Sequence, residues 1–286
     1  MKKRLIAVPA LAVMLMFAAQ AYTEDVIRVG VAAMISPKET ARYYTDMVMY
    51  VGEKTGRKIE IVQKENYAEM DSLLERKEVD LAFLCSGPYV KNRDKFGAEL
   101  LVAPQSYGQP FYYAYIIVHK DSPIKSLEEL KGKKFAFTDP KSNTGKLVPT
   151  FMIAKKFNET PERFFSDVMY SKSHDKSIEL VAKKLTDGAS IDSLIYDYSA
   201  KKNPVFTRLT KIIEKSPPYG IPPVVVNKSV DSKLKESVKN AFLNMHNDPK
   251  GRAILQGIMV DKFIVPKDSD YDSVREMEKF VSRISQ

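Results

Sequence analysis

The sequence predicts an α/β protein made of two α/β units, between which the chain crosses twice. Strand-like and helix-like segments alternate along most of the 286 residues, which is typical of a mostly parallel sheet covered by helices. A long aromatic stretch at 110–123, PFYYAYIIVHKDSP, interrupts this alternation, and a proline-rich extended stretch at 206–228 interrupts it again. Two interruptions of this kind indicate that one unit is begun, left and later completed.

The first series of elements follows the N-terminal segment. The β-branched residues of IRVGVAA predict a strand at 27–33, and the apolar spacing after it predicts a helix from Lys38 to about Lys54. The rest of the series is a strand at 58–63, a helix at 67–77, a buried strand at 79–84, a helix after Gly87 and a strand at 99–105.

A second series follows the aromatic stretch. It consists of a strand at 134–139, a helix at 144–157, a strand at 167–171, a helix at 174–185 and a strand at 190–195. The chain then returns through 206–228 and ends in helices near 231–246, 249–257 and 270–284.

We therefore predict a discontinuous division into two lobes. Residues 22–112 and 215–286 form lobe one, and residues 113–214 form lobe two. Two crossings that lie side by side make a hinge, and the cleft between two lobes is the default place for a ligand.

The N-terminus predicts export. Residues 2–4 are basic, residues 5–18 are apolar, and Ala19-Gln20-Ala21 fits a signal-peptidase site, so we expect residues 1–21 to be a cleavable signal peptide and the protein to be periplasmic. Cleavage removes three of the 45 basic residues, which leaves a net charge of +6 (42 − 36). The basic residues are scattered among acidic ones, so we expect no nucleic-acid partner.

The chemistry-bearing residues are few. Cys85 is the single cysteine, so a disulfide within the chain is excluded, and its apolar neighbours predict a buried, unreactive thiol. Three isolated histidines give no metal-ligand spacing. No nucleophile elbow or Ser/His/Asp set is evident. We expect a protein that is not an enzyme, with no cofactor and no metal.

The stretch SNTGKLVPTF at 142–151 looks at first like a nucleotide-binding loop. Gly145 precedes Lys146, but a Walker loop needs a glycine where Pro140 stands and a hydroxyl residue where Leu147 stands. Nucleotide hydrolysis is therefore excluded here.

What remains at 142–151 is a helix N-terminus after a strand. Such an end presents free N–H groups and the positive pole of the helix dipole, and the Ser142 and Thr144 hydroxyls add donors. Ordinary capping by Ser142 or Asn143 explains the same residues without a ligand. From the stretch alone both interpretations stay open.

Further candidates lie at other strand ends. Ser36 and the Cys85-Ser86 pair open helices directly after strands, where open α/β sheets bind ligands, although capping explains each alone. His174 begins a helix after a strand, where a ligand contact, a helix cap and a solvated side chain all stay open. Asp192 and Ser193 face the same cleft if their strand is parallel to its neighbours. A carboxylate at that place accepts a hydrogen bond from a protonated phosphoryl oxygen and repels a fully deprotonated oxyanion. A solvated loop is the alternative for Asp192.

Several motifs in order closely resemble the phosphate/phosphite/phosphonate substrate-binding proteins of ABC transporters. They cover about residues 25 to 284 and are VGVAAMISPKETARYY, VDLAFLCSGPYV, FAFTDPKSNTGKLVP, SHD at 173–175, IDSLIYDY and DPKGRAIL…FIVPKDSDYDSVR. The resemblance implies a type II periplasmic binding protein fold, a small phosphorus oxyanion as ligand and an inner-membrane permease as partner. We expect a monomer.

The resemblance also implies which residues bind. The hydroxyl-rich motif of the family falls on Ser142, Asn143, Thr144 and Gly145, the helix-start histidine on His174 and the acidic residue on Asp192, while Tyr43, Tyr44 or Tyr112 are the candidates for an aromatic wall. Asn143 replaces one hydroxyl residue of the typical S-T-S motif, which favours a small head group such as phosphite, methylphosphonate or phosphate. A sensory protein with the same ligand, an exported enzyme of the same fold, and a binder of sulfonates, thiamine precursors or amino acids are the alternatives.

Overall fold

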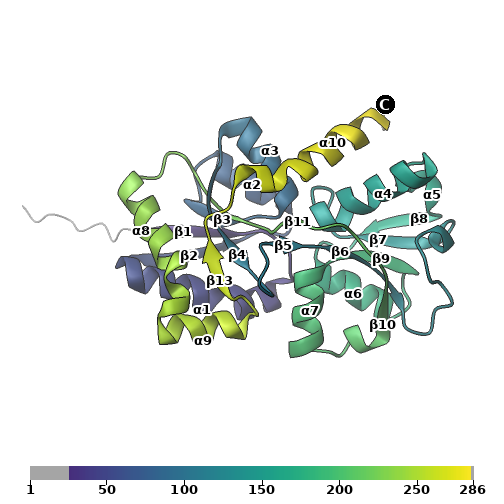
Figure 1. Ribbon diagram of the computed structural model, residues 1–286, viewed down its shortest axis with the longest axis horizontal. Coiled ribbons are helices and arrows are strands. Elements are labelled where there is room, and N and C mark those ends of the chain that lie inside the picture. Colours follow the sequence, from purple (N-terminus) through teal and green to yellow (C-terminus); the bar gives the residue numbers. More distant parts are fainter. Residues whose placement is uncertain (1–25, 285–286) are drawn as a thin grey trace, which may run out of the picture.

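The computed structural model describes residues 26–284, without the side chains of Pro37, Thr40, Ala41 and Arg42. The predicted signal peptide lies outside the described residues. Two separate sheets organise the chain, and Figure 1 shows them side by side, each covered by helices. We call the part around the six-stranded sheet lobe one and the part around the five-stranded sheet lobe two.

Lobe one combines the first series of elements with the C-terminal part of the chain. Its strands, in order across the sheet, are β13 (Lys262–Ile264), β4 (Glu99–Gln105), β12 (Val224–Val226), β3 (Leu81–Phe83), β1 (Val26–Val31) and β2 (Lys58–Gln63). Its helices are α1 (Pro37–Thr55), α2 (Tyr67–Glu75), α3 (Ser86–Phe96), α8 (Ser232–Leu243), η4 (Met245–Asn247), α9 (Pro249–Gly257), η5 (Asp268–Tyr271) and α10 (Asp272–Ile284). The pairs of β1 with β2 and β3 are parallel, whereas β12 and β13 pair antiparallel.

Lobe two contains the second series. Its strands are, in order, β10 (Thr210–Lys215), β6 (Ala114–His119), β9 (Gly188–Asp192), β7 (Lys134–Phe137) and β8 (Asp167–Tyr170). Its helices are η1 (Glu128–Leu130), η2 (Asn143–Leu147), α4 (Val148–Phe157), α5 (Pro161–Phe164), α6 (His174–Ala182), α7 (Ser193–Lys202) and η3 (Thr207–Leu209). Separate apolar clusters pack on the two faces of this sheet.

The two crossings pair with each other. The short strands β5 (Phe111–Tyr112) and β11 (Tyr219–Gly220) are antiparallel and lie between the lobes in Figure 1. Helix α10 also reaches across: it packs on α3 of lobe one and α4 of lobe two, where the Phe280 and Phe151 rings meet edge to face at 5.1 Å. The predicted boundaries of the lobes, near residues 113 and 215, stay a prediction.

Two predicted elements of lobe two change in the structure. The strand expected at 190–195 ends at Asp192, because the Asp192 carboxylate accepts a hydrogen bond from Leu194 N (2.8 Å) and so caps helix α7. The helix expected at 144–157 begins with a π-helical turn at 143–147. Pro149 lacks the N–H that an α-helical bond to Gly145 O requires, and Gly145 O accepts Thr138 N instead.

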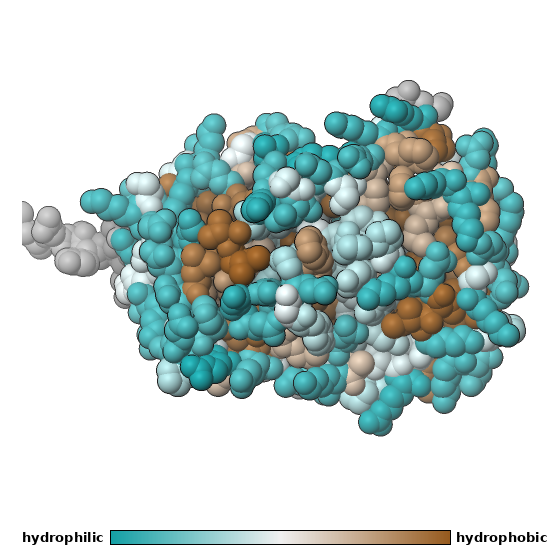
Figure 2. Space-filling view, in the orientation of Figure 1, coloured by the Kyte–Doolittle hydropathy of each residue, from teal (hydrophilic) through white to brown (hydrophobic). Residues whose placement is uncertain are grey.

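The face of the molecule in Figure 2 is covered mostly by hydrophilic residues, with the hydrophobic ones in separate patches over the two lobes. Within residues 26–284 no helix has both the length and the apolar character needed to cross a membrane. The candidate site residues are not part of that surface, because nearly all of them are buried.

Candidate functional site

The candidate site lies where strand ends of both lobes meet, and the lobes contact each other directly around it. His174 N donates to Met34 O (3.0 Å), and Ser36 N donates to an Asp175 carboxylate oxygen (2.9 Å). On the far side of the site Lys141 Nζ forms an ion pair with Asp71 (2.6 Å). These contacts join residues of different lobes, so the structure has the lobes closed over the site.

The junction after β7 supplies the densest group of polar atoms. Ser142 Oγ accepts Gly145 N (3.0 Å), so the capping interpretation is confirmed for this hydroxyl. A Cβ atom at Gly145 would lie 2.5 Å from the Thr138 side chain, so only glycine fits this position. The Thr144 hydroxyl, in contrast, is buried and has no hydrogen-bond partner.

Four buried polar atoms near the contact between the lobes lack a partner in the described part of the chain. They are Thr144 Oγ1, Asn143 Oδ1, His174 Nε2 and Tyr67 Oη. A buried polar group without a hydrogen bond costs about 1–3 kcal/mol, so native proteins keep few of them. Four in one region indicate a surface shaped for a polar ligand.

His174 is held in one tautomer. Its Nδ1 accepts the backbone N–H of Asp192 (3.1 Å) and lies 3.1 Å from the Thr138 hydroxyl. Burial lowers the pKa of His174 to about 3, so the ring is neutral at physiological pH. Since Nδ1 is an acceptor, the single ring proton is on Nε2. That unpartnered atom is therefore a hydrogen-bond donor.

Asn143 connects the two lobes. Its backbone N–H donates to Cys85 Sγ (3.4 Å), and its Nδ2 donates to Tyr112 Oη (3.0 Å). The predicted burial of the Cys85 thiol is confirmed, and burial raises its pKa, which keeps it protonated. The remaining amide atom, Oδ1, is free to accept a hydrogen bond from a ligand. Rotation of the amide by 180° would present the Nδ2 donor there instead.

Asp192 ends β9 beside His174 and is 2% exposed, so the solvated-loop alternative is wrong. Burial raises the pKa of Asp192 to about 7. It borders a cavity of about 40 Å³ whose other walls include Tyr43, Tyr44, Phe83 and Leu194. The walls are largely apolar, and the space admits only a few non-hydrogen atoms.

Other predicted site hydroxyls are engaged within the protein. Ser86 Oγ donates to Gly220 O (2.6 Å), and Ser193 Oγ accepts Tyr113 N (3.0 Å). Ser36 caps α1 without a side-chain bond, and only its backbone N–H crosses to lobe two. For these three residues contact with a ligand stays a prediction.

Two buried residues beside the site, Tyr67 and Thr138, carry no direct signal in the sequence. Tyr67 is the first residue of α2, after β2, so it belongs to another strand-to-helix junction. The available signal was Asn66 with Glu69 three residues later, which forms a helix cap in the structure (Glu69 N to Asn66 Oδ1, 2.9 Å). Thr138 gives no signal of its own, because its role depends on the ring of His174. Among residues 26–284 no group of three or more His, Cys, Asp or Glu side chains is placed to hold a metal ion.

Two α/β lobes, two crossing strands and a buried polar site between the lobes define a type II periplasmic binding protein. Two solved structures share this architecture. A binding-protein component of a phosphonate ABC transporter from Pseudomonas aeruginosa has a TM-score of 0.86 and 24% identity over 92% of this chain and 88% of that one. A Prochlorococcus marinus protein in complex with methylphosphonate has a TM-score of 0.82 and 17% identity over 91% of this chain and 99% of that one.

The sequence also matches a family model. The model described as "ABC transporter, phosphonate, periplasmic substrate-binding protein" matches residues 29–271, and the chain belongs to this family. The phosphonates-binding periplasmic protein of Escherichia coli K12 is 24% identical over 262 residues, which are 90% of this chain and 77% of that protein. The predicted family and fold are confirmed.

Proposed function

We propose that this protein is the periplasmic solute-binding component of an ABC importer and that it captures a small phosphorus oxyanion, namely phosphite, a phosphonate or phosphate. The observation that carries the proposal is the pair of unpartnered donors, Thr144 Oγ1 and His174 Nε2, buried where helices of lobe two begin. Both groups are uncharged hydrogen-bond donors, and the helix N-termini beside them favour an anion.

Binding requires no chemistry in this proposal. The two lobes close about the β5–β11 pair, and the closed form delivers its ligand to a membrane permease. In this proposal lobe one consists of residues 22–112 and 215–286, and lobe two of residues 113–214. The imidazole of His174 stays neutral far below pH 7 because burial makes it a poor proton acceptor, and the Cys85 thiol is protonated and contacts Asn143 N, so neither acts as a general base or nucleophile in this proposal. We propose that the chain acts as a monomer that a cleavable signal peptide exports.

The apolar cavity beside Asp192 favours a small substituent on phosphorus. A space of about 40 Å³ suits a hydrogen or methyl group and leaves little room for an aminoalkyl chain. The methylphosphonate in the complex of the Prochlorococcus marinus protein is a ligand of this size. In this proposal Asp192, whose pKa is near 7, accepts a hydrogen bond from a ligand that carries a P–OH proton.

Thermal unfolding with a ligand panel tests the proposal. The panel contains phosphite, methylphosphonate, phosphate, 2-aminoethylphosphonate and sulfate. A ligand at one hundred times its Kd stabilises by about 2.7 kcal/mol, which raises Tm by roughly 5–10 °C for a protein of this size. Phosphite or methylphosphonate should give the largest shift. Equal shifts across the panel, or none, would overturn the proposal.

A further inference from the structure

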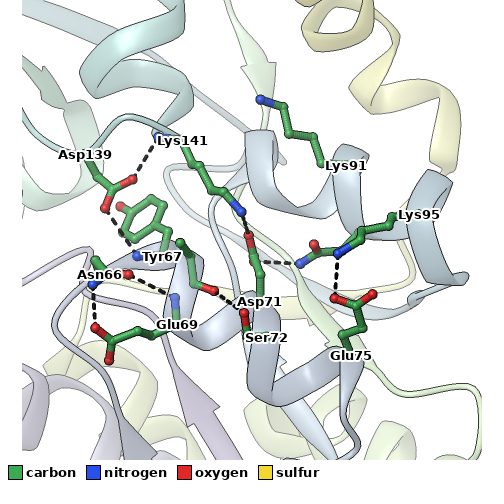
Figure 3. Close-up of polar contacts among 12 residues, drawn as sticks. Asn66, Tyr67, Glu69, Asp71, Ser72, Glu75, Lys91, Lys95, Asp139 and Lys141 are labelled. Atoms are coloured by element: carbon green, nitrogen blue, oxygen red, sulfur yellow. Dashed lines mark hydrogen bonds and ion pairs between the residues drawn. The ribbon is translucent and has the colours of Figure 1, made fainter.

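Asp71 is a buried carboxylate of lobe one whose cation comes from lobe two. It lies in helix α2 and is 5% exposed. One carboxylate oxygen accepts a hydrogen bond from Asn92 Nδ2 (2.6 Å) of helix α3, and the other accepts one from Lys141 Nζ (2.6 Å). Figure 3 shows the Lys141 side chain extending from lobe two to the Asp71 carboxylate on α2. We call Asp71 and Lys141 the buried pair.

The turn that carries Lys141 is held against lobe one by its backbone. Lys141 N donates to Asp139 Oδ1 (2.8 Å), and Asp139 Oδ2 accepts Tyr67 N (3.2 Å) at the start of α2. A Cβ atom at Gly87 would lie 2.7 Å from Lys141 O, so the turn also touches the first residues of α3. These contacts place the Lys141 ammonium against Asp71 when the lobes are closed.

The two partners differ in how they would tolerate the loss of the other. Burial raises the pKa of the Asp71 carboxyl, and the hydrogen bonds from Lys141 and Asn92 oppose that shift by favouring the ionised form. A buried carboxylate that loses its cation is strongly destabilised, because neither water nor another charge replaces it. The Lys141 side chain is 34% exposed, so its ammonium can turn to water. Loss of the lysine should therefore harm the closed form more than loss of the carboxylate.

A second ion pair between the lobes supplies the contrast, and we call it the exposed pair. Lys172 Nζ of lobe two lies 3.3 Å from a Glu65 carboxylate oxygen of lobe one, and the two side chains are 70% and 78% exposed. Exposed pairs are solvated and screened by salt, so they contribute little. Removal of the charge of Lys172 should leave the closed form nearly unaffected.

We propose that the buried pair, supported by Asn92, stabilises the closed form and so raises affinity for the ligand without touching it. This inference rests on the proposed function and extends it to the equilibrium between open and closed lobes. The pair forms when the lobes meet and breaks when they part, so its free energy adds to that of the ligand contacts in the closed form alone. Asp71 and Lys141 are thus positioning residues.

Isothermal titration with phosphite tests the inference on wild type, Lys141→Met, Asp71→Asn, the double variant and Lys172→Met. Lys141→Met leaves the buried carboxylate without its cation and should weaken binding roughly 10- to 100-fold. Asp71→Asn should weaken it about 2- to 10-fold. The double variant should bind more tightly than Lys141→Met, because no uncompensated carboxylate remains. Lys172→Met, the control in the exposed pair, should stay within about twofold of wild type.

The sign of the change in Asp71→Asn separates the buried pair from long-range attraction of the anion. Attraction alone would make phosphite bind more tightly once a negative charge is removed. Equal or tighter binding in Asp71→Asn, wild-type affinity in Lys141→Met, a double variant no better than Lys141→Met, or an equal loss in Lys172→Met would each overturn the inference alone.

The unfolding temperature without ligand supplies a second measurement. Open lobes do not bring the two residues together, so ligand-free Lys141→Met should unfold at the wild-type temperature. A clearly lower temperature would show that the pair serves the fold of the ligand-free protein and would overturn the inference. Failure of wild type to bind phosphite, methylphosphonate or phosphate would overturn the proposed function and this inference with it.

Discussion

Two strand-to-helix junctions, one after β7 in lobe two and one after β3 in lobe one, place small polar residues at the contact between the lobes and use them differently. After β7, Ser142 caps the helix and the Thr144 hydroxyl is left over. After β3, the Ser86 hydroxyl donates to Gly220 O in the crossing strand β11, and no hydroxyl is left over. A ligand contact needs an atom that the fold itself does not use.

The difference between the junctions follows from the number of hydroxyl groups and from the backbone around them. The π turn after β7 holds two hydroxyl residues within three positions, so one caps and the other faces the interior. The junction after β3 has a single hydroxyl residue, Ser86, which stands between Cys85 and Gly87. Gly87 is in turn required, since a Cβ atom there would lie 2.7 Å from Lys141 O of lobe two. The junction after β3 is built for contact between the lobes.

The largest effect should come from His174→Phe. The change removes the Nε2–H donor and leaves Asp192 N and the Thr138 hydroxyl without their shared acceptor. A lost charge-assisted bond together with the disturbed support should weaken phosphite binding about 100-fold and lower the free energy of unfolding by about 1–3 kcal/mol. Titration calorimetry and urea unfolding measure the two effects. His119→Phe, at the far end of β6, is the control and should bind normally; equal affinity in the two variants would contradict the assignment.

Thr144→Val tests the junction after β7 directly. Valine keeps the shape of threonine and removes the Thr144 hydroxyl, which has no partner among the described residues. We expect affinity for phosphite to fall roughly 10- to 100-fold, while stability without ligand stays the same or rises, because a buried unsatisfied group is removed. Calorimetry and ligand-free thermal unfolding give the two readouts. A variant that loses stability but keeps its affinity would show that Thr144 serves the fold.

The contrast between the junctions also shows what the sequence can predict. The order of strands and helices, the strand-to-helix junctions and the position of His174 at a helix start depend on neighbouring residues, so local patterns indicate them. The use of Ser86 depends on Gly220, 134 positions away in the chain, and no local pattern reports such a partner. Tyr67 was missed for the same reason, because a buried phenol without a partner is recognised only in three dimensions.

The end of β9 shows a further limit. The run at 190–195 is apolar enough to extend the strand, but the Asp192 carboxylate binds Leu194 N and begins a helix instead. Asp192 is thus both the helix cap and a wall of the apolar cavity. Its unusual pKa arises from burial, which depends on residues far from it in the chain.

The next largest effect concerns Asp192 and pH. Its pKa is raised to about 7, so the carboxyl is neutral below that pH and ionised above it. Sulfate carries no proton in this range, so its binding requires the neutral carboxyl, and affinity should be flat below about pH 7 and fall roughly tenfold per pH unit above it. Asp192→Asn should abolish the slope and bind sulfate about tenfold more tightly than wild type one unit above the pKa. The same slope in both proteins, measured by calorimetry, would show that Asp192 does not face the anion.

The smallest effect on binding should come from Ser86→Ala. The Ser86 hydroxyl donates to Gly220 O, so its loss leaves a buried carbonyl without that bond and should lower the free energy of unfolding by about 1 kcal/mol. Affinity for phosphite should stay within about twofold of wild type, because no ligand bond is removed. Thermal unfolding and calorimetry on both variants should give opposite patterns if the two junctions differ as described. Ser86→Ala should lose stability and keep its affinity, whereas Thr144→Val should lose affinity and keep its stability. If Ser86→Ala instead lost as much affinity as Thr144→Val, both junctions would bind the ligand, and the absence of a spare hydroxyl after β3 would no longer separate them.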